Sequence, residues 1–404
     1  MTEPKHIALV IKSLKGGGMQ RSILRLADGI ANRGIKVDVV VTGKLEGTIR
    51  DQVPENVRLF SLSRSLLPWM KLRAAIRSFE DDAKTGDRPV PMPLSLPRAS
   101  RFLPALVRYL SFERPDGLIV AGTDYNLIAL WAKRLSGVPT RIVVSERNSM
   151  KEVLESYASE DKWRWRYTAG LVAKAYPTAN AVVANSAGVA VDLANCTGLK
   201  LDSLKTIYNP IVSLSLEEKA LQPVEHPWFA PGLPPVVLGV GRLHPQKDFA
   251  TLIRAFARVR SQRDARLVII GDHRKIEERN DLLSLAEKLG VSNDVDLPGF
   301  ASNPFSYMAK SDVFVLSSKY EGCPNVLVEA LACGCPVVST RCPHGPDEIL
   351  ENGKYGRLVD VGDDEAMAVA ISATLDGSKN PDYLRKRAQD FSFASAVDQY
   401  LGCF

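Results

Sequence analysis

The sequence predicts an α/β protein built from two doubly wound, Rossmann-like domains. Its 404 residues are too many for one ordinary hydrophobic core and suggest two domains of about 200 residues each. In both halves, short runs of valine, isoleucine and leucine alternate with stretches of helical periodicity, as in parallel sheets covered by helices. We expect a first domain over residues 1–210, a linker over 211–235 and a second domain over 236–390.

Composition and charge narrow the classes of function. Hydrophobic residues make up 45% of the chain and charged residues 24%, which is ordinary for a soluble globular protein. The net charge of +6 is spread along the chain. It favours an anionic partner without distinguishing a phosphate compound, a membrane surface or nucleic acid. No nucleic-acid-binding motif is present, and we expect no nucleic-acid partner.

No segment predicts secretion or membrane insertion. The apolar run at 7–11 is too short for a signal peptide, and no run of about 18 apolar residues exists. Six cysteines in a chain of this size form no disulfide framework, which favours the cytoplasm. Cys323, Cys333, Cys335 and Cys342 cluster without the spacing of a zinc site, so we expect buried free thiols.

The first domain opens with a βαβ unit that carries a glycine-rich loop. Its strand, loop, helix and second strand are predicted at residues 7–12, 12–21, 23–31 and 37–41. Gly17 and Gly18 would let the backbone approach a ligand at the helix N-terminus. The loop lacks the GxGxxG spacing of a dinucleotide-binding fold, and no acidic residue ends the second strand. A ligand loop and a plain tight turn therefore both stay open.

Residues 61–110 differ in character from the rest of the first domain. Arginines and lysines are interleaved there with leucine, phenylalanine and tryptophan, on both sides of a proline-rich stretch at 88–93. This pattern is typical of a surface that rests on an anionic membrane. It is equally typical of an amphipathic helix with a solvated basic face, and both interpretations stay open.

Further strands of the first domain are followed by polar residues. We predict strands at 117–121, 141–144 and 206–210, and a strand-to-helix junction at 181–186. Glu146 and Arg147 follow the second of these strands. Ligands of open α/β sheets bind at the carboxyl ends of the strands, so both side chains are candidate site residues.

The second domain repeats the strand–helix alternation. Strands are predicted at 236–240, 267–270, 295–297, 313–316 and 336–340, and helices at 249–260, 275–289 and 304–309. Arg242 and Lys247 lie in the loop between the first strand and its helix, so both cations can converge on an anion. The alternative is that both are solvated surface charges.

The helix predicted after residues 317–323 is apolar on all sides but one. Pro324 suits its first position and Gly334 the residue beyond its end. Asn325 and Glu329 form one polar stripe, and Glu321 lies just before the helix N-terminus, where anions are favoured. The pattern indicates a site for a polyhydroxylated, phosphorylated ligand. The alternative is that Glu321 caps the helix and Glu329 pairs with a buried arginine.

These motifs together resemble the retaining glycosyltransferases of family four, which have the GT-B architecture. The resemblance is carried by Glu321 and Glu329 with seven residues between them, by the loop from Gly241 to Lys247, and by Gly345-Pro346. It covers nearly the whole chain. It implies two Rossmann-like domains that face each other across a cleft, with a C-terminal helix at 391–404 that returns to the first domain.

The resemblance also implies roles for individual residues. Arg242 and Lys247 would neutralise the donor diphosphate, so that no metal or other cofactor is expected. Glu329 would bind the ribose, and Glu321, the third catalytic residue beside these two cations, would hold the donor sugar. The remaining donor-binding residues implied are Gly17, Gly18, Gly271, Pro298, Gly322, Cys323, Pro324, Asn325 and Val326. The Asp294-Val295-Asp296 motif runs into a strand and has no implied metal role.

The implied activity is transfer of a sugar from a nucleotide-diphosphate sugar, with UDP-sugars favoured, to a lipid-linked or polysaccharide acceptor of a bacterial surface glycan. Many family members have a histidine where this chain has Glu146 and Arg147, and acceptor positioning is the hypothesis for this pair. The enzyme would be cytoplasmic, with peripheral contact to the inner face of the membrane through 61–110. The alternatives are a nucleotide-sugar epimerase or hydrolase, a non-catalytic glycan-binding relative and, least favoured, a nicotinamide-dependent oxidoreductase.

Overall fold

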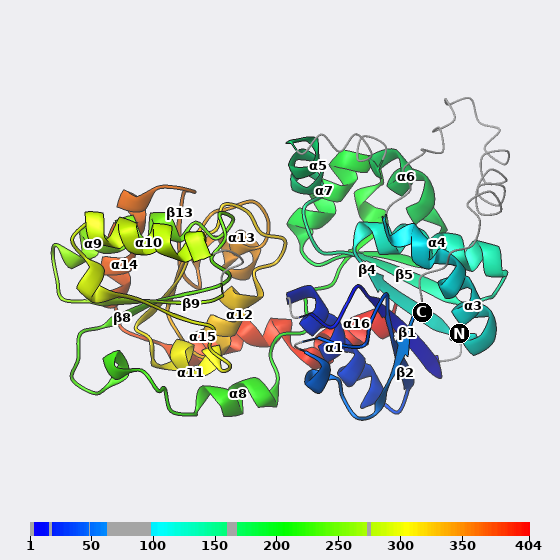
Figure 1. Cartoon of the computed structure of the whole chain (residues 1–404), viewed down its shortest axis with the longest axis horizontal. Helices are drawn as coiled ribbons and strands as arrows, with labels where there is room; N and C mark the ends of the chain where they lie inside the picture. Colours follow the sequence, from blue (N-terminus) through cyan, green and yellow to red (C-terminus); the bar gives the residue numbers. More distant parts are fainter. Residues whose placement is uncertain (1–3, 16–17, 48, 63–97, 160–167, 273–275) are drawn as a thin grey trace. The chain divides into compact units, whose positions relative to one another are not determined.

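The computed structural model divides the chain into two compact units (Figure 1). Unit 1 comprises Met1–Pro210 and Phe393–Phe404, and unit 2 comprises Ile211–Ser392. The structure describes residues 4–404 apart from 16–17, 48, 63–97, 160–167 and 273–275. Most of the basic, apolar segment at 61–110 and Gly17 therefore lie outside the described residues. No helix of the described part is long and apolar enough to span a bilayer.

Unit 1 is built on a parallel sheet that has seven strands within the described residues, in the order β3-β2-β1-β4-β5-β6-β7. Ile7 on the central strand pairs with Val37 on one side and Gly117 on the other. The strands are β1 (His6–Ile11), β2 (Lys36–Val41), β3 (Val57–Ser61), β4 (Gly117–Ala121), β5 (Arg141–Glu146), β6 (Ala181–Ala184) and β7 (Leu204–Thr206).

Helices cover both faces of this sheet and bury two hydrophobic cores. The helices are α1 (Gly18–Ala31), α3 (Leu103–Glu113), α4 (Thr123–Ser136), α5 (Met150–Ser159), α6 (Thr168–Ala175), α7 (Ala187–Thr197) and α16 (Phe393–Leu401). Ile23 of α1 and Tyr400 of α16 belong to the core on one face. Leu106 of α3 and Ile128 of α4 belong to the core on the other. The helix expected at 391–404 is thus part of unit 1.

Unit 2 contains a second parallel sheet, with six strands in the described residues in the order β10-β9-β8-β11-β12-β13. Its strands are β8 (Val236–Val240), β9 (Arg266–Ile270), β10 (Val295–Gly299), β11 (Val313–Leu316), β12 (Val337–Thr340) and β13 (Arg357–Val359). Val237 and Val315 of its central strands are buried in a core with helical residues such as Phe256. The predicted fold class of two doubly wound α/β sheets is therefore confirmed.

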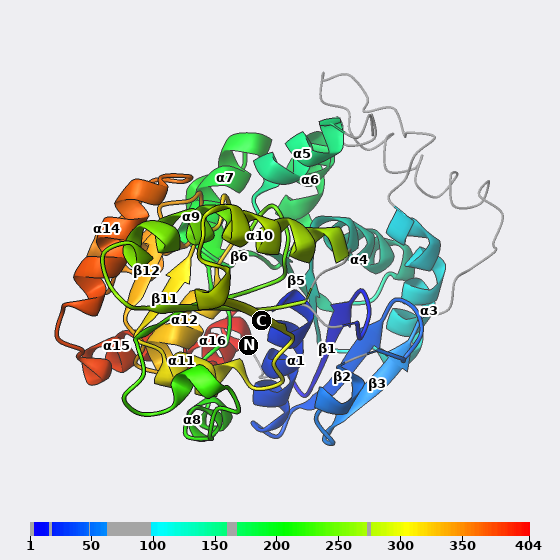
Figure 2. The same cartoon turned by 60° about the vertical axis from the view of Figure 1, so that its left-hand side comes forward.

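The helices of unit 2 are α8 (Leu214–Ala220), α9 (Phe249–Arg260), α10 (Ile276–Lys288), α11 (Pro304–Lys310), α12 (Asn325–Ala332), α13 (Pro346–Ile349), α14 (Asp364–Leu375) and α15 (Pro381–Ala388). Figure 2 shows unit 2 from a second side, with α9 and α10 over one face of the sheet and α12 and α15 over the other. Residues 211–235, expected as a linker, belong to unit 2 and include α8.

Both sheets reverse their strand order at one point. In unit 1 the order runs outward from β1 in one direction and from β4 in the other, and in unit 2 the same happens between β8 and β11. At such a reversal the helices following the two central strands lie on opposite faces, which leaves a crevice at the carboxyl ends. The loops after β1 and β4, and those after β8 and β11, are therefore the places to look for a site.

Candidate functional site

In unit 2 an ion pair joins the two loops at the reversal point. Lys247, in the loop after β8, donates from Nζ to Oε1 of Glu321, in the loop after β11, over 2.6 Å. Ser318 Oγ donates to the same carboxylate oxygen over 2.7 Å. Glu321 is only 9% exposed, so its carboxylate is held in one place by two donors. The sequence-predicted residues Lys247 and Glu321 are thus brought together.

Backbone hydrogen bonds fix these two loops to each other. Ser317 Oγ donates to the Lys247 carbonyl oxygen over 2.7 Å, and the Lys319 N–H donates to the Gln246 carbonyl oxygen over 2.8 Å. Gln246 Nε2 in turn donates to the Tyr320 carbonyl oxygen over 2.9 Å. Because backbone groups of both loops are satisfied by this pairing, the side chains that the loops carry are preorganised.

Gly271 lets a third loop pack against this pair. A Cβ atom at Gly271 would overlap the carbonyl oxygen of Gly241, so only glycine allows the loop after β9 to lie against the loop after β8. The Leu243 N–H donates to the Asp272 carbonyl oxygen over 2.9 Å and fixes this contact. Pro298, expected beside the base, is exposed near the end of β10. The structure therefore gives Gly271 a packing role, whatever the ligand.

The helix α12 begins as its sequence suggests, with one difference. Pro324 is the residue before the helix, with ψ of 86°, and not its first helical residue. Leu327, Val328 and Leu331 are buried, whereas Asn325 and Glu329 are partly exposed and lie on one side. The helix thus presents the predicted polar stripe, and its N-terminus adjoins the loop that carries Glu321.

The loop after β12 packs against the start of α12. A Cβ atom at Gly345 would overlap the Pro324 ring, and Gly345 has a φ of 99°, which favours glycine. The Glu321 N–H donates to the Pro343 carbonyl oxygen over 3.1 Å. Gly322, Cys323 and Val326, implied as donor-binding residues, are partly exposed beside this contact.

The charge of Arg242 is not neutralised by the protein. Arg242 is exposed, and within the described residues no carboxylate forms an ion pair with it. Together with Lys247 and the N-terminus of α12, it makes the carboxyl edge of unit 2 attractive to an anion. The contacts contradict the alternative that Glu321 only caps the helix, because its carboxylate accepts hydrogen bonds from Lys247 and Ser318.

Three of the four cysteines near this site are buried thiols. Cys333, Cys335 and Cys342 are buried and form no disulfide, whereas Cys323 is partly exposed and also forms no disulfide, which confirms three of the four predicted buried thiols. Burial raises the pKa of the Cys342 thiol to about 12, and the neighbouring Glu321 carboxylate adds to the rise. A thiol with such a pKa neither ligates a metal readily nor acts as a nucleophile near neutral pH.

The two aspartates of the Asp294-Val295-Asp296 motif bind different protein groups. Asp294 accepts from Arg260 over 2.7 Å and also pairs with Arg266, whereas Asp296 lies 3.0 Å from His226. In the part of the chain that the structure describes, no three histidine, cysteine or carboxylate side chains are grouped to hold a metal ion. The motif is therefore explained by ion pairing.

In unit 1, Glu146 lies at the end of β5 and is buried on the α4 face of the sheet. Its carboxylate accepts from Thr123 Oγ1 over 3.0 Å, from Asn126 Nδ2 over 3.1 Å and from the Tyr176 hydroxyl. It is 4% exposed. Burial raises the pKa of Glu146 to about 7, although these three donors oppose the rise. The side chain is therefore close to half protonated at neutral pH.

Arg147, the next residue, is buried on the opposite face. Its guanidinium donates to Ser22 Oγ over 2.9 Å, to Asn209 Oδ1 over 2.5 Å and to the Tyr400 hydroxyl over 3.1 Å. These partners are neutral, and the side chain is 5% exposed. Arg147 thus links α1 and α16 to Asn209. Asn209 lies one residue before Pro210, after which the chain continues into unit 2. Glu146 and Arg147 are both occupied by protein partners.

The sequence analysis missed Asp124, which lies at the reversal point of unit 1. It is in the first turn of α4, directly after β4, and burial raises the pKa of its carboxyl group to about 6 while Lys12 opposes the rise. Gly18, which follows the loop after β1, is the first residue of α1 and is exposed. The signal for Asp124 was available, since a polar triplet, Gly122 to Asp124, follows a fully apolar strand.

Comparison with known families covers both units. The sequence matches the family model "Glycosyltransferase Family 4" over residues 16–212. It matches the model "Glycosyl transferases group 1" over residues 226–391. The first match spans most of unit 1, and the second contains every site residue of unit 2 described above.

Two of the named relatives are glycosyltransferases of bacteria. The chain is 31% identical over 306 residues to the N-acetylgalactosamine-N,N'-diacetylbacillosaminyl-diphospho-undecaprenol 4-alpha-N-acetylgalactosaminyltransferase of Campylobacter jejuni, a match that covers 74% of this chain and 77% of the relative. It is 38% identical over 172 residues to the lipopolysaccharide core biosynthesis glycosyltransferase LpsE of Rhizobium meliloti, which covers 41% of this chain and 48% of LpsE.

Solved structures share the fold over nearly the whole chain. The Anabaena protein HepE in complex with UDP and glucose matches with a TM-score of 0.72 and 20% identity, over 98% of each chain. A glycosyltransferase of Rickettsia africae matches with a TM-score of 0.74 and 17% identity, over 99% of this chain and 97% of the other. At such identities the likeness shows the fold.

Proposed function

Because this chain belongs to the glycosyltransferases of group 1 and family 4, with the GT-B fold, we propose that it is a retaining, metal-independent enzyme that uses a UDP-sugar. Its acceptor is a lipid-linked glycan of a bacterial surface polysaccharide. The observation that carries the proposal is the arrangement in unit 2, where Lys247 and Glu321 are paired at the sheet reversal beside the unpaired Arg242. UDP in the HepE complexes supports the choice of base, and the Campylobacter jejuni relative's name supports a lipid-linked acceptor.

The cations act on the leaving group. Arg242 binds oxygens of the donor diphosphate bidentately and Lys247 adds a point charge from the adjacent loop. Negative charge grows on the diphosphate as the bond to the sugar breaks, and cations placed in advance stabilise this charge more than they stabilise the ground state. Two positive side chains supply the stabilisation that other enzymes obtain from a bound metal ion.

The carboxylates hold the donor. Glu321 already has a fixed position through Lys247 and Ser318, so it accepts hydrogen bonds from hydroxyl groups of the donor sugar without reorganisation. Glu329 accepts from the ribose hydroxyls on the polar stripe of α12. The α12 N-terminus completes the donor site with backbone N–H groups from Gly322 to Val326, except at Pro324, which has no N–H and contributes only its ring.

The chemical step exchanges one C–O bond for another. The bond between the anomeric carbon and the diphosphate breaks through an oxocarbenium-like transition state, and an acceptor hydroxyl forms the new bond on the same face. The hydroxyl proton passes to the departing phosphate oxygen, which Arg242 and Lys247 hold. No proton acceptor from the protein is required, which agrees with the engagement of Glu321 by two donors.

Unit 1 receives the acceptor. Glu146 and Arg147 are buried among protein partners, so in this proposal they position α4, α1 and α16 and the acceptor contacts the exposed groups around them. Gly18 begins α1 and is exposed, so in this proposal its backbone is open to an anionic ligand. Peripheral contact with the anionic inner face of the membrane through 61–110 brings the enzyme to its acceptor.

Transfer from radiolabelled UDP-sugars to a bacterial membrane extract tests the proposal. We expect Arg242→Ala and Glu321→Gln each to lower kcat/KM by about a hundredfold, and activity to persist in EDTA. Lys386→Ala, which removes an exposed cation of α15 in the same unit, is the control and retains full activity. Full activity in both site variants contradicts the site. Release of free sugar at the same rate without any acceptor points to a hydrolase instead.

A further inference from the structure

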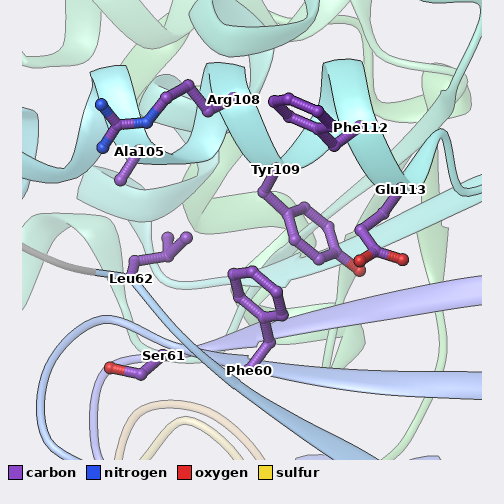
Figure 3. A pocket seen from close by; sticks show the side chains of 8 residues that line it. All are labelled: Phe60, Ser61, Leu62, Ala105, Arg108, Tyr109, Phe112 and Glu113. Carbon is purple, nitrogen blue, oxygen red and sulfur yellow. The ribbon is translucent and has the colours of Figure 1, made fainter.

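Unit 1 contains a pocket that the donor chemistry does not use. It has a volume of about 410 Å³ and lies between the edge strand β3 and the helix α3 (Figure 3). This volume falls within the range of small-molecule sites. It is lined by Phe60, Ser61, Leu62, Ala105, Arg108, Tyr109, Phe112 and Glu113.

The floor of the pocket is rigid. The rings of Phe60 and Tyr109 meet edge to face with centroids 4.9 Å apart, and the Tyr109 hydroxyl donates to Asp38 Oδ2 over 2.5 Å. Arg58 donates to both oxygens of Asp38, over 2.8 and 2.6 Å, and to Glu113 over 2.5 Å. Burial alone would raise the pKa of Asp38, but its hydrogen bonds hold that pKa well below the usual range. The pocket is therefore preformed around a charged network.

Three of the polar side chains that line the pocket, those of Ser61, Tyr109 and Glu113, already have partners within the protein. Ser61 Oγ donates to the Gly43 carbonyl oxygen over 2.6 Å, and the Tyr109 hydroxyl donates to Asp38. The Glu113 carboxylate accepts a hydrogen bond from Arg58. A sugar ring needs several free hydrogen-bonding groups around it. The pocket offers mainly aromatic and aliphatic surface, so its chemistry suits a hydrocarbon chain better than a carbohydrate.

Two side chains of α3 are exposed at the rim and complement an amphiphilic anion. Phe112 is 85% exposed, and Arg108 lies on the same side of the helix four residues before it. The two positions are about 6 Å apart along the helix axis. Within the described residues Arg108 has no carboxylate partner, whereas both carboxylates beside the pocket are held by Arg58. An anionic group beside Arg108 and an apolar chain along Phe112 would cover both.

The direction of the pocket fits the order of groups in a lipid-linked sugar. Arg58, near the start of β3, binds Glu113 at the end of α3, while Leu62, beyond the end of β3, lines the pocket with Ala105. The Arg108 end therefore lies toward the carboxyl edge of the sheet, and the Phe112 end away from it. β3 is two strands from β1, roughly 10 Å across the sheet. A diphosphate beside Arg108 would have its sugar at the carboxyl edge.

We propose that the β3–α3 pocket binds the first part of the apolar chain of a lipid diphosphate, with the diphosphate beside Arg108. This site rests on the proposed function, and it defines the acceptor as a lipid diphosphate whose accepting sugar is close to the lipid. A concave site of this size takes a single chain, whereas the plane of a bilayer requires a flat or convex surface. The acceptor and not the bulk membrane is thus the assigned partner.

Direct binding of farnesyl diphosphate to the full chain tests the site. We expect calorimetry to give an affinity at least about tenfold weaker for Phe112→Ser than for the wild type, because most of the ring becomes buried on binding. Arg108→Gln weakens the binding of farnesyl diphosphate but not the binding of farnesol, which has no diphosphate. Leu221→Ser, in unit 2, removes an equally exposed apolar side chain, 85% exposed, and leaves binding unchanged. A photoreactive farnesyl diphosphate should label peptides around 60–62 and 105–113.

Transfer assays separate this site from the proposed function. With an isoprenoid-linked acceptor, Phe112→Ser and Arg108→Gln raise the acceptor KM about tenfold, and the wild-type preference over a short-chain acceptor disappears. Transfer with an unchanged acceptor KM in both variants overturns the pocket and leaves the function standing. Labelling of the pocket without any transfer overturns the function and leaves the lipid diphosphate site standing.

Three other outcomes overturn the pocket as assigned. Labelling elsewhere in the chain places the lipid at another site. If phosphatidylglycerol vesicles bind through Arg108 and Phe112 while farnesyl diphosphate does not, the partner is the membrane surface. If Phe112→Ser lowers the melting temperature by several degrees with no effect on probe binding, the protein covers this side chain itself.

Discussion

The sheets of the two units have the same strand order, except that unit 1 has β7 as an additional edge strand. The two units differ in how charged side chains are arranged at the carboxyl edges of these sheets. In unit 2 a lysine and a glutamate from neighbouring loops form an ion pair, and Arg242 is exposed in the same loop as the lysine, with no carboxylate partner among the residues that the structure describes. In unit 1 Glu146 and Arg147 are adjacent in sequence, yet each is buried on its own face of the sheet among neutral partners.

This difference separates two kinds of task. Exposed and partly exposed cations remain available to a strong anion such as a diphosphate. Buried charges with neutral partners are costly to desolvate, and the several hydrogen bonds that hold them fix neighbouring elements in place. The same topology thus provides a site that can neutralise an anion in unit 2. In unit 1 it provides a sheet edge whose neighbouring helices are held in place by buried polar contacts.

Replacement of Lys247 gives the largest effect expected from this comparison. Lys247→Met removes a cation from the growing charge on the leaving diphosphate, and we expect kcat to fall by about 10²–10³. Lys247→Arg keeps the charge and should recover part of the rate. Because Lys247→Met also leaves Glu321 without its partner, thermal unfolding must be measured on the same protein. A kcat within threefold of the wild type would show that unit 2 does not neutralise the leaving group.

Protonation of Glu146 gives the next largest effect, seen in stability against pH. An unfolded glutamate has a pKa of about 4.3, and in the folded protein burial raises the pKa of Glu146 to about 7. The folded state therefore binds the proton more tightly, and this stabilisation is complete below pH 4.3 and is lost as pH rises to 7. The difference is on the order of 3 kcal/mol.

Glu146→Gln isolates this contribution, since glutamine stays neutral and keeps an acceptor for Tyr176. Relative to the wild type, the variant should gain free energy of unfolding between pH 5 and pH 8 in urea titrations. Asp124, whose pKa is raised to about 6, is a like charge that adds to the rise at Glu146, so the comparison is repeated in an Asp124→Asn background. A difference that does not change with pH would mean that Glu146 is ionised throughout.

The fold of unit 2 could be predicted well from the sequence because its two central strands, β8 and β11, are free of polar side chains and several of its helices have clear ends. The predicted limits of α9 and β11 match the observed Phe249–Arg260 and Val313–Leu316. Two edge strands, β3 and β13, were missed, since Val57–Ser61 contains an arginine and Arg357–Val359 is only three residues long. The last strand of unit 1 was predicted at 206–210, but β7 is Leu204–Thr206.

The site was predictable only where residues share a loop or a helix face. Arg242 with Lys247, and Asn325 with Glu329, follow from spacing alone. The contact between Lys247 and Glu321 joins loops 74 residues apart, and only the strand order brings them together. The opposite faces taken by Glu146 and Arg147 also depend on which helices cover each face, which spacing does not encode.

A smaller effect is expected at Arg147, and it tests whether this buried charge is structural. Arg147→Met removes three hydrogen bonds, to Ser22, Asn209 and Tyr400, and should lower the free energy of unfolding by about 2 kcal/mol. Arg263→Met, which breaks an ion pair with the exposed Asp376, is the control and should cost less than about 1 kcal/mol. Greater stability of Arg147→Met would show that the desolvation of the guanidinium outweighs its hydrogen bonds.

The smallest effect is expected at Glu329, where unit 2 would bind the donor without acting on the reacting bond. Glu329→Gln weakens hydrogen bonds to the ribose equally in the ground and transition states, so the KM for the UDP-sugar should rise about tenfold while kcat is unchanged. The same substitution at Glu321 should lower kcat, because that carboxylate adjoins Lys247. Initial rates over a range of UDP-sugar concentrations give both constants. If Glu329→Gln instead lowers kcat as strongly as Glu321→Gln, the two carboxylates act as one unit, and the separation of donor binding from leaving-group stabilisation within unit 2 is wrong.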